Sequence, residues 1–148
     1  MSITNYLGPA EIAAYTLRSQ QANTGAARGL SKITNYQKYA GQDFAQNRSQ
    51  ARRNFGLTYR ALPASFARRN VLRSGMRETA RTNSAYDYQQ ALNRMRQGYD
   101  RQMGGFQEQT GDINLIQSMT LAQIEAEKAA RQEQLASQLT LLQNGSGG

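Results

Sequence analysis

The sequence contains no cysteine and no histidine among its 148 residues. Without cysteine there is no disulfide framework and no thiolate metal site. The absence of histidine removes the commonest general base and metal ligand of proteins. A nucleophile would have to be a serine or threonine activated by lysine, and no spacing singles out such a pair. We therefore expect a protein that is not an enzyme and that has no metal site or cofactor.

Valine and proline are also scarce. Valine occurs once, at Val71, and proline twice, at Pro9 and Pro63. Alanine, glutamine, arginine, leucine and methionine, which form helices well, are abundant instead. No segment alternates apolar and polar side chains as a half-buried strand does. We predict an all-α fold with two to three long helices, either elongated or folded back as a helical hairpin.

Long apolar runs are missing as well. No stretch approaches the roughly 20 apolar residues that cross a bilayer, and the N-terminus lacks the pattern of a secretory signal. The apolar residues are few and often small, whereas a compact domain of this length buries a richer set. Such a composition indicates either partial disorder in isolation or stability gained through oligomeric assembly. We expect no membrane partner and no small-molecule substrate.

Acidic residues are almost absent from one segment, which concentrates the charge of the chain. Between residues 48 and 81 there is one acid, Glu78, and this segment alone accounts for the net charge of +8. Its nine basic residues are Arg48, Arg52, Arg53, Arg60, Arg68, Arg69, Arg73, Arg77 and Arg81. Charge confined to one segment indicates a binding surface, whereas charge that serves only solubility would be spread over the whole chain.

Four of these arginines recur at steps of four and would form one stripe, about 18 Å long, on a helix: Arg69, Arg73, Arg77 and Arg81. The stripe could follow the phosphates of DNA, with an affinity that depends on salt and not on sequence. Alternatively it pairs with acids of another helix or subunit, or remains solvated. The candidate acids are Asp100, Glu108, Asp112 and Glu133. If Gly75 breaks the helix, the stripe splits and a subunit contact is favoured over a phosphate track.

Proline and glycine set the expected segment boundaries. Gly8-Pro9 marks a helix start, Leu62-Pro63 marks a boundary because a residue before proline disfavours helix, and Gly104-Gly105 offers a hinge. Asp112 is a plausible N-cap of the last helix. The predicted segments are an N-terminal piece 1–9, a first long helix 10–62, an Arg- and Tyr-rich helix 63–103, a glycine hinge 104–111, a C-terminal amphipathic helix 112–143 and a flexible tail 144–148.

Apolar residues recur every 11 positions, which is three turns of a nearly straight helix. This repeat consists of Ile33, Phe44, Phe55 and Phe66. It indicates either the core stripe of one helix or a long helix aligned with copies of itself. We expect Phe44, Phe55, Phe66, Tyr88 and Tyr99 to pack at interfaces, although tyrosines could also stack on bases.

The C-terminal helix has its own predicted stripe. Its members are Ile113, Ile116, Leu121, Ile124, Leu135, Leu139 and Leu142. Glu127 and Arg131 lie four residues apart in the order that favours an ion pair within a helix.

The stretch from Arg68 to Tyr99, "RRNVLRSGMRETARTNSAYDYQQALNRMRQGY", resembles a motif of small α-helical virion proteins of tailed bacteriophages. Those proteins carry an Arg-rich turn with Ser-Gly, then a Tyr/Ala/Gln-rich helix and a Gln/Glu/Arg-rich coiled segment. The resemblance implies an internal core, DNA-ejection, tail or neck component, located in the virion and, during assembly, in the host cytoplasm. Its implied partners are copies of itself, other virion proteins and DNA.

The sequence therefore leads to two functional hypotheses. The first is a non-enzymatic structural component of a phage particle that oligomerises through long helices, including coiled coils, with its arginine-rich corner facing DNA or acidic neighbouring subunits. The alternative is an autonomous, basic, nucleic-acid-binding protein of architectural type.

Overall fold

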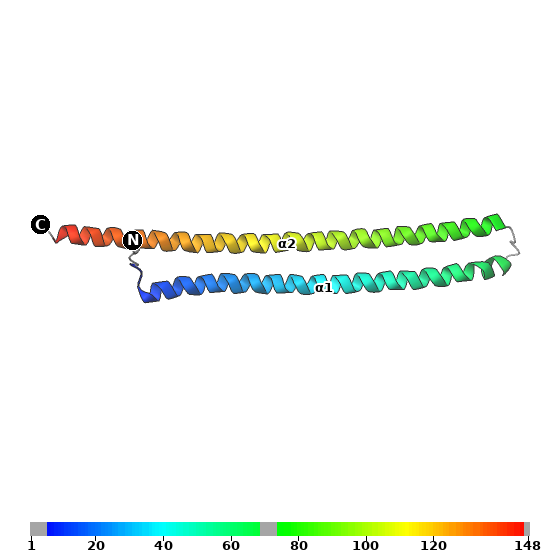
Figure 1. Ribbon diagram of the computed structural model, residues 1–148, viewed down its shortest axis with the longest axis horizontal. Coiled ribbons are helices and arrows are strands. Elements are labelled where there is room, and N and C mark those ends of the chain that lie inside the picture. The colour runs from blue at the N-terminus through cyan, green and yellow to red at the C-terminus, as the bar shows by residue number, and fades with distance from the viewer. Residues whose placement is uncertain (1–5, 69–73, 147–148) are drawn as a thin grey trace, which may run out of the picture. The chain divides into compact units, whose positions relative to one another are not determined.

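The computed structural model describes residues 6–68 and 74–146, and the side chains of residues 65–68 and 74 lie outside that description. The described part consists of two α-helices and contains no strand. Helix α1 comprises Pro9–Arg68 and helix α2 comprises Ser74–Gly145 (Figure 1). The predicted all-α class is confirmed. No stretch of these described helices is long and apolar enough to cross a membrane.

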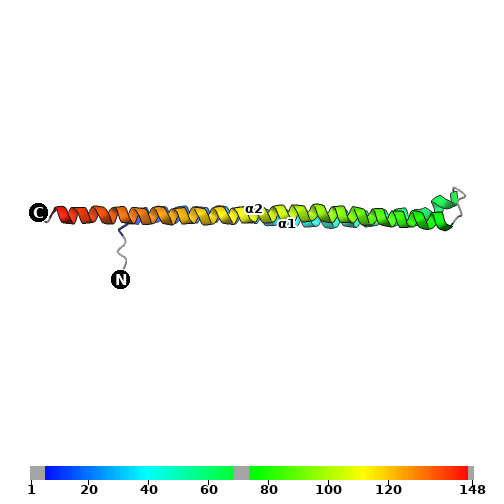
Figure 2. The ribbon, with the colours of Figure 1, turned by 90° about the horizontal axis from the view of Figure 1, so that it is seen from above.

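The helices contribute to two compact units, which we describe separately. Unit 1 comprises Met1–Ile33 and Gln109–Gly148, and unit 2 comprises Thr34–Glu108. Each unit thus combines one segment of α1 with one segment of α2, which lie side by side in Figure 1 and overlap in the view of Figure 2.

Aromatic side chains join α1 to α2 in unit 2. Phe44 stacks on Tyr99 with ring centroids 4.7 Å apart, and Phe55 stacks on Tyr88 at 4.4 Å. An advance of 11 residues along α1 is matched by an equal retreat along α2, so the two segments are antiparallel in a constant register. The predicted repeat therefore lines a contact within the chain at Phe44 and Phe55, and the side chain of Phe66 lies outside the described residues.

A close backbone approach joins the helices in unit 1. A Cβ added to Gly29 of α1 would lie 3.0 Å from Cδ1 of Ile113 in α2. Nearby, Nε2 of Gln117 donates a hydrogen bond of 2.9 Å to Oδ1 of Asn23. These contacts also fit an antiparallel pairing, because the α1 partner that comes later in the chain meets the α2 partner that comes earlier.

The buried core is small, as the composition predicts. Five apolar residues of the described chain are buried, two of them alanine: Leu7, Ala26, Ile33, Ala40 and Ile124. No charged or polar side chain is buried among the described residues. Burial of large apolar side chains is the main source of folding stability. The contacts between α1 and α2 bury few of them, so they stabilise the fold less than the core of a typical domain of this length does.

The boundary predicted at Leu62-Pro63 is wrong as a helix boundary, because α1 continues through Pro63 to Arg68. Proline lacks an N–H and its ring crowds the preceding turn, so it bends a helix more readily than it ends one near its terminus. The last turns of α1 bend out of line with the rest of the helix (Figure 2).

The hinge predicted at Gly104-Gly105 and the helix start at Asp112 are also wrong in structural terms, because α2 is continuous from Ser74 to Gly145. None of the described glycines has a φ angle in the left-handed region that would end a helix. Phe106 directly follows the glycine pair and stacks on Tyr36 at 6.4 Å, which helps to hold this part of α2 in place. The start at Pro9 is confirmed, with Ile12 N–H donating to the Gly8 carbonyl at 3.0 Å.

Ion pairs in unit 1 connect the two helices rather than neighbouring turns. Arg18 pairs with Glu127 at 2.5 Å and Arg131 pairs with Glu11 at 3.3 Å. The predicted pair of Glu127 with Arg131 is replaced by these two, which is possible because each side chain reaches across to α1. The hydrogen bond from Arg18 lowers the pKa of Glu127 and raises the pKa of Arg18.

Candidate functional site

Four arginines on the α1 segment of unit 2 form what we call the arginine surface. They are Arg48, Arg52, Arg53 and Arg60, and all four side chains are exposed. No carboxylate of the described residues forms an ion pair with any of them. Over the 12 residues that separate the first from the last, a helix rises about 18 Å. Four arginines of the predicted basic segment therefore face solvent.

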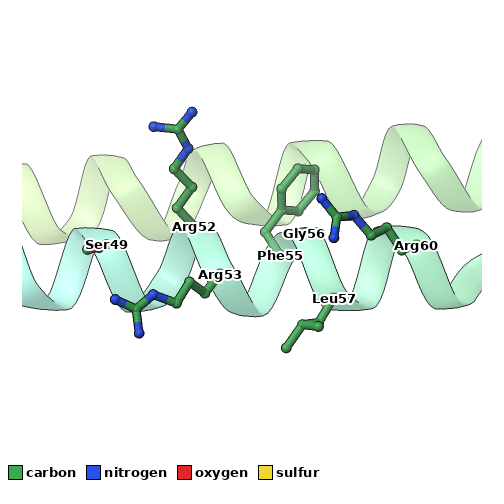
Figure 3. A pocket seen from close by; sticks show the side chains of 7 residues that line it. All are labelled: Ser49, Arg52, Arg53, Phe55, Gly56, Leu57 and Arg60. Atoms are coloured by element: carbon green, nitrogen blue, oxygen red, sulfur yellow. The ribbon is translucent and has the colours of Figure 1, made fainter.

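The arginine surface covers more than one side of α1. Figure 3 shows Arg52 and Arg53 pointing to opposite sides of the helix, while the Phe55 ring points toward α2. Arg52, Arg53 and Arg60 line one shallow groove together with Ser49, Leu57 and the backbone around Gly56. A second groove brings Arg48 and Arg52 together with Tyr88 of α2. Arg52 lines both grooves and so links the two halves of the surface.

Aromatic rings border the arginine surface. The Arg48 guanidinium lies 5.8 Å from the centroid of the Phe44 ring, within the range of a cation–π contact. Leu57 is also exposed here, at 66% of its surface. Guanidinium groups beside apolar and aromatic surface are a combination that recognises anions carrying flat or apolar parts, such as nucleotides.

The stripe predicted at steps of four is only partly described. Arg69 and Arg73 lie outside the described residues, as does the side chain of Arg68. Arg77 is exposed near the start of α2. Arg81 is different, because its guanidinium lies 5.6 Å from the centroid of the Tyr59 ring and its Nε is buried without an acceptor. Arg81 therefore belongs to the contact between α1 and α2 rather than to a free row of cations.

The acids proposed as arginine partners do not serve that role within the chain. All four are exposed, and none forms an ion pair in the described structure: Asp100, Glu108, Asp112 and Glu133. The described structure thus shows no ion pair between these acids and arginines of the same chain. The prediction that the arginines pair with acids of a separate molecule remains to be tested.

The two units differ sharply in charge. Unit 2 contains 13 basic and five acidic residues, a net charge of +8. Unit 1 contains five basic and five acidic residues and is neutral. Two of the basic residues of unit 1 are paired with its own acids. The whole net charge of the chain therefore resides in the unit that carries the arginine surface.

One contact beside this surface, between Tyr59 and Arg81, was missed by reasoning from sequence. Tyr59 was not linked to an arginine, although it lies four residues after Phe55, one turn along the same helix. Its ring lies 5.5 Å from that of Phe55 and joins the aromatic contact with Tyr88. The predicted interface aromatics Phe44, Phe55, Tyr88 and Tyr99 are all half-buried in contacts within the chain.

The chemistry available here is electrostatic binding. Fixed guanidinium groups donate hydrogen bonds to phosphate or carboxylate oxygens, with two parallel bonds from one arginine where the geometry allows. No cluster of three or more potential metal-ligating side chains occurs in the part of the chain that the structure describes. Comparison of the chain with protein-family models, with curated proteins and with solved structures found no match.

Proposed function

We propose that the chain is a non-enzymatic structural component of a bacteriophage particle. In this role it assembles through its long helices and presents the arginine surface of unit 2 to DNA or to acidic neighbouring subunits. The phage context rests on the resemblance of the Arg68–Tyr99 stretch to virion proteins. The assembly role is supported by the small core, and the anionic partner by the unpaired arginines.

The observation that carries the proposal is the arginine surface itself. Four exposed guanidinium groups lie on one stretch of α1 without a carboxylate partner among the described residues. The sequence contains ten acidic residues, and two of those in unit 1 form ion pairs with Arg18 and Arg131. The four arginines of the arginine surface have no such ion pair with a described acid. Uncompensated charge of one sign in one unit favours a partner of the opposite sign.

The geometry suits a polyanion without sequence-specific recognition. A duplex carries one charge per about 1.7 Å of its axis, so 18 Å of surface faces on the order of ten phosphate charges. The arginines point to several sides of the helix rather than as one recognition edge (Figure 3). Contacts of this kind position a protein on the DNA backbone but do not read bases.

Acidic subunits are the second form of the same anionic partner. Exposed, unpaired carboxylates are available on this chain at Asp112 and Glu133 of unit 1. In an assembly of many copies, the neutral unit of one chain could meet the basic unit of another through these groups. The guanidinium–carboxylate chemistry is the same as for phosphate, so a binding experiment must include both types of anion.

The test uses the full chain with a short random-sequence duplex and, separately, an acidic polypeptide, followed by fluorescence anisotropy over a range of salt concentrations. We expect the logarithm of duplex affinity to fall with the logarithm of salt with a slope of about −3 to −4 for four arginine contacts. The variant with Arg53→Ala and Arg60→Ala should reduce the magnitude of that slope by about 2. The matched control is Arg28→Ala with Arg101→Ala, which removes the same charge outside the arginine surface.

Equal losses of affinity in the two double variants would show that net charge alone drives binding, and would refute the assigned surface. Binding of the acidic polypeptide but not of the duplex would select acidic subunits as the partner. Tight duplex binding by a monomeric chain would favour the autonomous nucleic-acid-binding protein, to which the exposed Tyr59 and Tyr86 could contribute stacking.

A further inference from the structure

The α2 segment of unit 1 has apolar side chains on two opposite faces. The face toward α1 contains Ile113 and Ile124, of which Ile113 meets Gly29 and Ile124 is 2% exposed. Ile116, also part of the predicted stripe, is 63% exposed and lines a groove with Ala22 and Gly25 of α1. A helix that is apolar on one face only needs one partner, whereas a helix apolar on two faces is usually covered on both.

The opposite face carries a second stripe, which we call the outer stripe. Its members are separated by steps of four, three, four and three residues: Leu115, Met119, Ala122, Ala126 and Ala129. All five are exposed, with Leu115 at 59% and Met119 at 62%. The alternation of three and four residues is the spacing with which a helix packs along another helix in a coiled coil. The stripe is about 21 Å long.

Other outward faces of the molecule differ from the outer stripe. On α1 of unit 1, Gln20, Thr24, Arg28 and Ser31 are polar and exposed, and one exposed leucine, Leu17, precedes them. On α2 of unit 2, Asn83, Gln97 and Arg101 are polar and exposed, with the exposed Tyr86 among them. Apolar side chains thus occur singly on these two faces, whereas Leu115–Ala129 contains five of them in succession along one face.

The surface area of the chain leaves room for a partner of its own size. The accessible surface is 11575 Å² for a mass of 16.5 kDa. A compact monomer of that mass exposes about 7,600 Å², so the chain exposes about 4,000 Å² in addition. Permanent dimers bury about 2,000–5,000 Å² in total, or about 1,000–2,500 Å² on each chain. The additional surface of one chain is therefore large enough to accommodate the interface of a dimer.

The sizes of the side chains along the outer stripe are complementary to a reversed copy of it. Large residues, Leu115 and Met119, occupy one end, and small ones, Ala126 and Ala129, occupy the other. In an antiparallel pair centred on Ala122, each large side chain lies against an alanine of the partner. A two-fold symmetric interface has this pattern, because residue i of one copy contacts residue j of the other copy, and residue j of the first contacts residue i of the second.

We propose that two copies of the chain pair antiparallel through the outer stripe of unit 1, centred on Ala122. This inference rests on the proposed assembly role and names the surface that performs it. Unit 1 provides the contact between copies, and the arginine surface of unit 2 stays available for its anionic partner.

Charge gives the pair a distinctive salt dependence. Asp112 and Glu133 stand at the two ends of the outer stripe, and an antiparallel pair brings the Asp112 end of one copy near the Glu133 end of the other. Salt screens the repulsion between such exposed like charges. Self-association should therefore strengthen as salt is raised, whereas binding of the arginine surface to DNA weakens.

The absence of cysteine allows a direct test by cross-linking of single-cysteine variants of the full chain. Under mild oxidation Ala122→Cys should form a covalent dimer in high yield. Leu115→Cys and Ala129→Cys should each cross-link poorly alone, because the two cysteines of such a dimer lie at opposite ends of the interface. A mixture of the two variants should give a covalent mixed dimer, because position 115 of one copy faces position 129 of the other. Efficient self-linking of Leu115→Cys would indicate a parallel pair and overturn the proposal.

Sedimentation equilibrium supplies the second arm. Leu115→Gln with Met119→Gln should weaken dimer formation by roughly tenfold or more, because both side chains occupy the interface. The control Leu17→Gln replaces an exposed leucine of α1 in the same unit, 53% exposed, and should leave the association unchanged. Equal association in all three proteins would refute the outer stripe. Duplex binding by the arginine surface would survive that result, so failure here is separate from failure of the proposed anionic partner.

Discussion

A Cβ atom at Gly29 would lie 3.0 Å from Cδ1 of Ile113, whereas a Cβ at Gly25, one turn earlier, would meet nothing within 4 Å. The two glycines belong to the same helix and carry the same backbone cost in a helix, about 1 kcal/mol each relative to alanine. They differ in what faces them. Gly29 faces the Ile113 side chain at close range, and Gly25 is open.

Substituting these glycines with valine should separate packing from helix propensity. Gly29→Val places a branched side chain against Ile113 and should lower the free energy of unfolding by about 1–3 kcal/mol, as overpacking does. Gly25→Val is the matched control with the same change in propensity and should leave stability unchanged or slightly raised. Urea unfolding followed by circular dichroism measures both. Equal effects at the two positions would contradict the close approach at Gly29.

The Phe55–Tyr88 stack is expected to couple the two helices of unit 2. The ring centroids lie 4.4 Å apart with planes inclined by 13°. Phe55→Ala and Tyr88→Ala should each destabilise the chain, and a double-mutant cycle should show a coupling energy of about 0.5–1.5 kcal/mol. The cycle between Phe55 and Tyr36, which do not stack on one another, is the control. A coupling near zero in the first cycle would mean that this stack does not form in solution.

Removing Pro63 should stabilise α1. Proline in a helix interior forgoes one backbone hydrogen bond and strains the preceding turn, at a cost of up to about 3 kcal/mol. Because α1 runs through this position, Pro63→Ala should raise the melting temperature and straighten the end of the helix. Thermal unfolding compares it with Ala64→Gly, an exposed neighbour whose change should have the opposite sign. A destabilised Pro63→Ala protein would indicate that the chain requires a boundary at Pro63.

The ion pair between Arg18 and Glu127 predicts a small, acid-sensitive contribution to stability. The pKa of Glu127 is lowered in the folded state by the hydrogen bond from Arg18. A carboxyl group with a lowered folded pKa stabilises the fold above its unfolded pKa, about 4.3, and loses that effect as the pH falls through the folded value. The melting temperature of wild type should therefore exceed that of Glu127→Gln at pH 7 and converge with it at low pH.

Salt provides the check on that ion pair. Both side chains are substantially exposed, 45% for Arg18 and 42% for Glu127, so the difference at pH 7 should shrink as salt is raised. The control Glu125→Gln changes a nearby exposed acid that forms no ion pair in the described structure. A difference between wild type and Glu127→Gln that persists at low pH would point to packing rather than charge.

The sequence predicted the helical class, together with Ile33 and Ile124 of the five buried residues described, because both depend on local, periodic information. Phe44, Phe55, Tyr88 and Tyr99 were recognised from their spacing, and they meet in the structure. The predicted breaks at Pro63 and Gly104-Gly105 failed because helix propensity is a weak guide that tertiary context overrides. Phe106 and Tyr36, for example, meet next to the glycine pair although they are far apart in sequence.

Site prediction was limited by contacts between distant residues. The concentration of arginine was visible in the sequence, but the burial of the Arg81 Nε against Tyr59 required knowledge of how α1 and α2 align. The same holds for Glu127, whose partner is 109 positions away rather than one turn away. Ile116 borders α1 but is 63% exposed, and its degree of exposure could not be inferred from its apolar type alone.

The central claim is that a chain with so small a core is completed by copies of itself. The most direct measurement is the melting temperature of the unmodified chain over a hundredfold range of concentration, with the mass at each concentration determined by sedimentation equilibrium. A higher concentration favours the folded assembly over unfolded single chains by mass action. We therefore predict a melting temperature that rises steadily with concentration and a mass of at least two chains. A cooperative melt at a concentration-independent temperature, from a species with the mass of one chain, would contradict it.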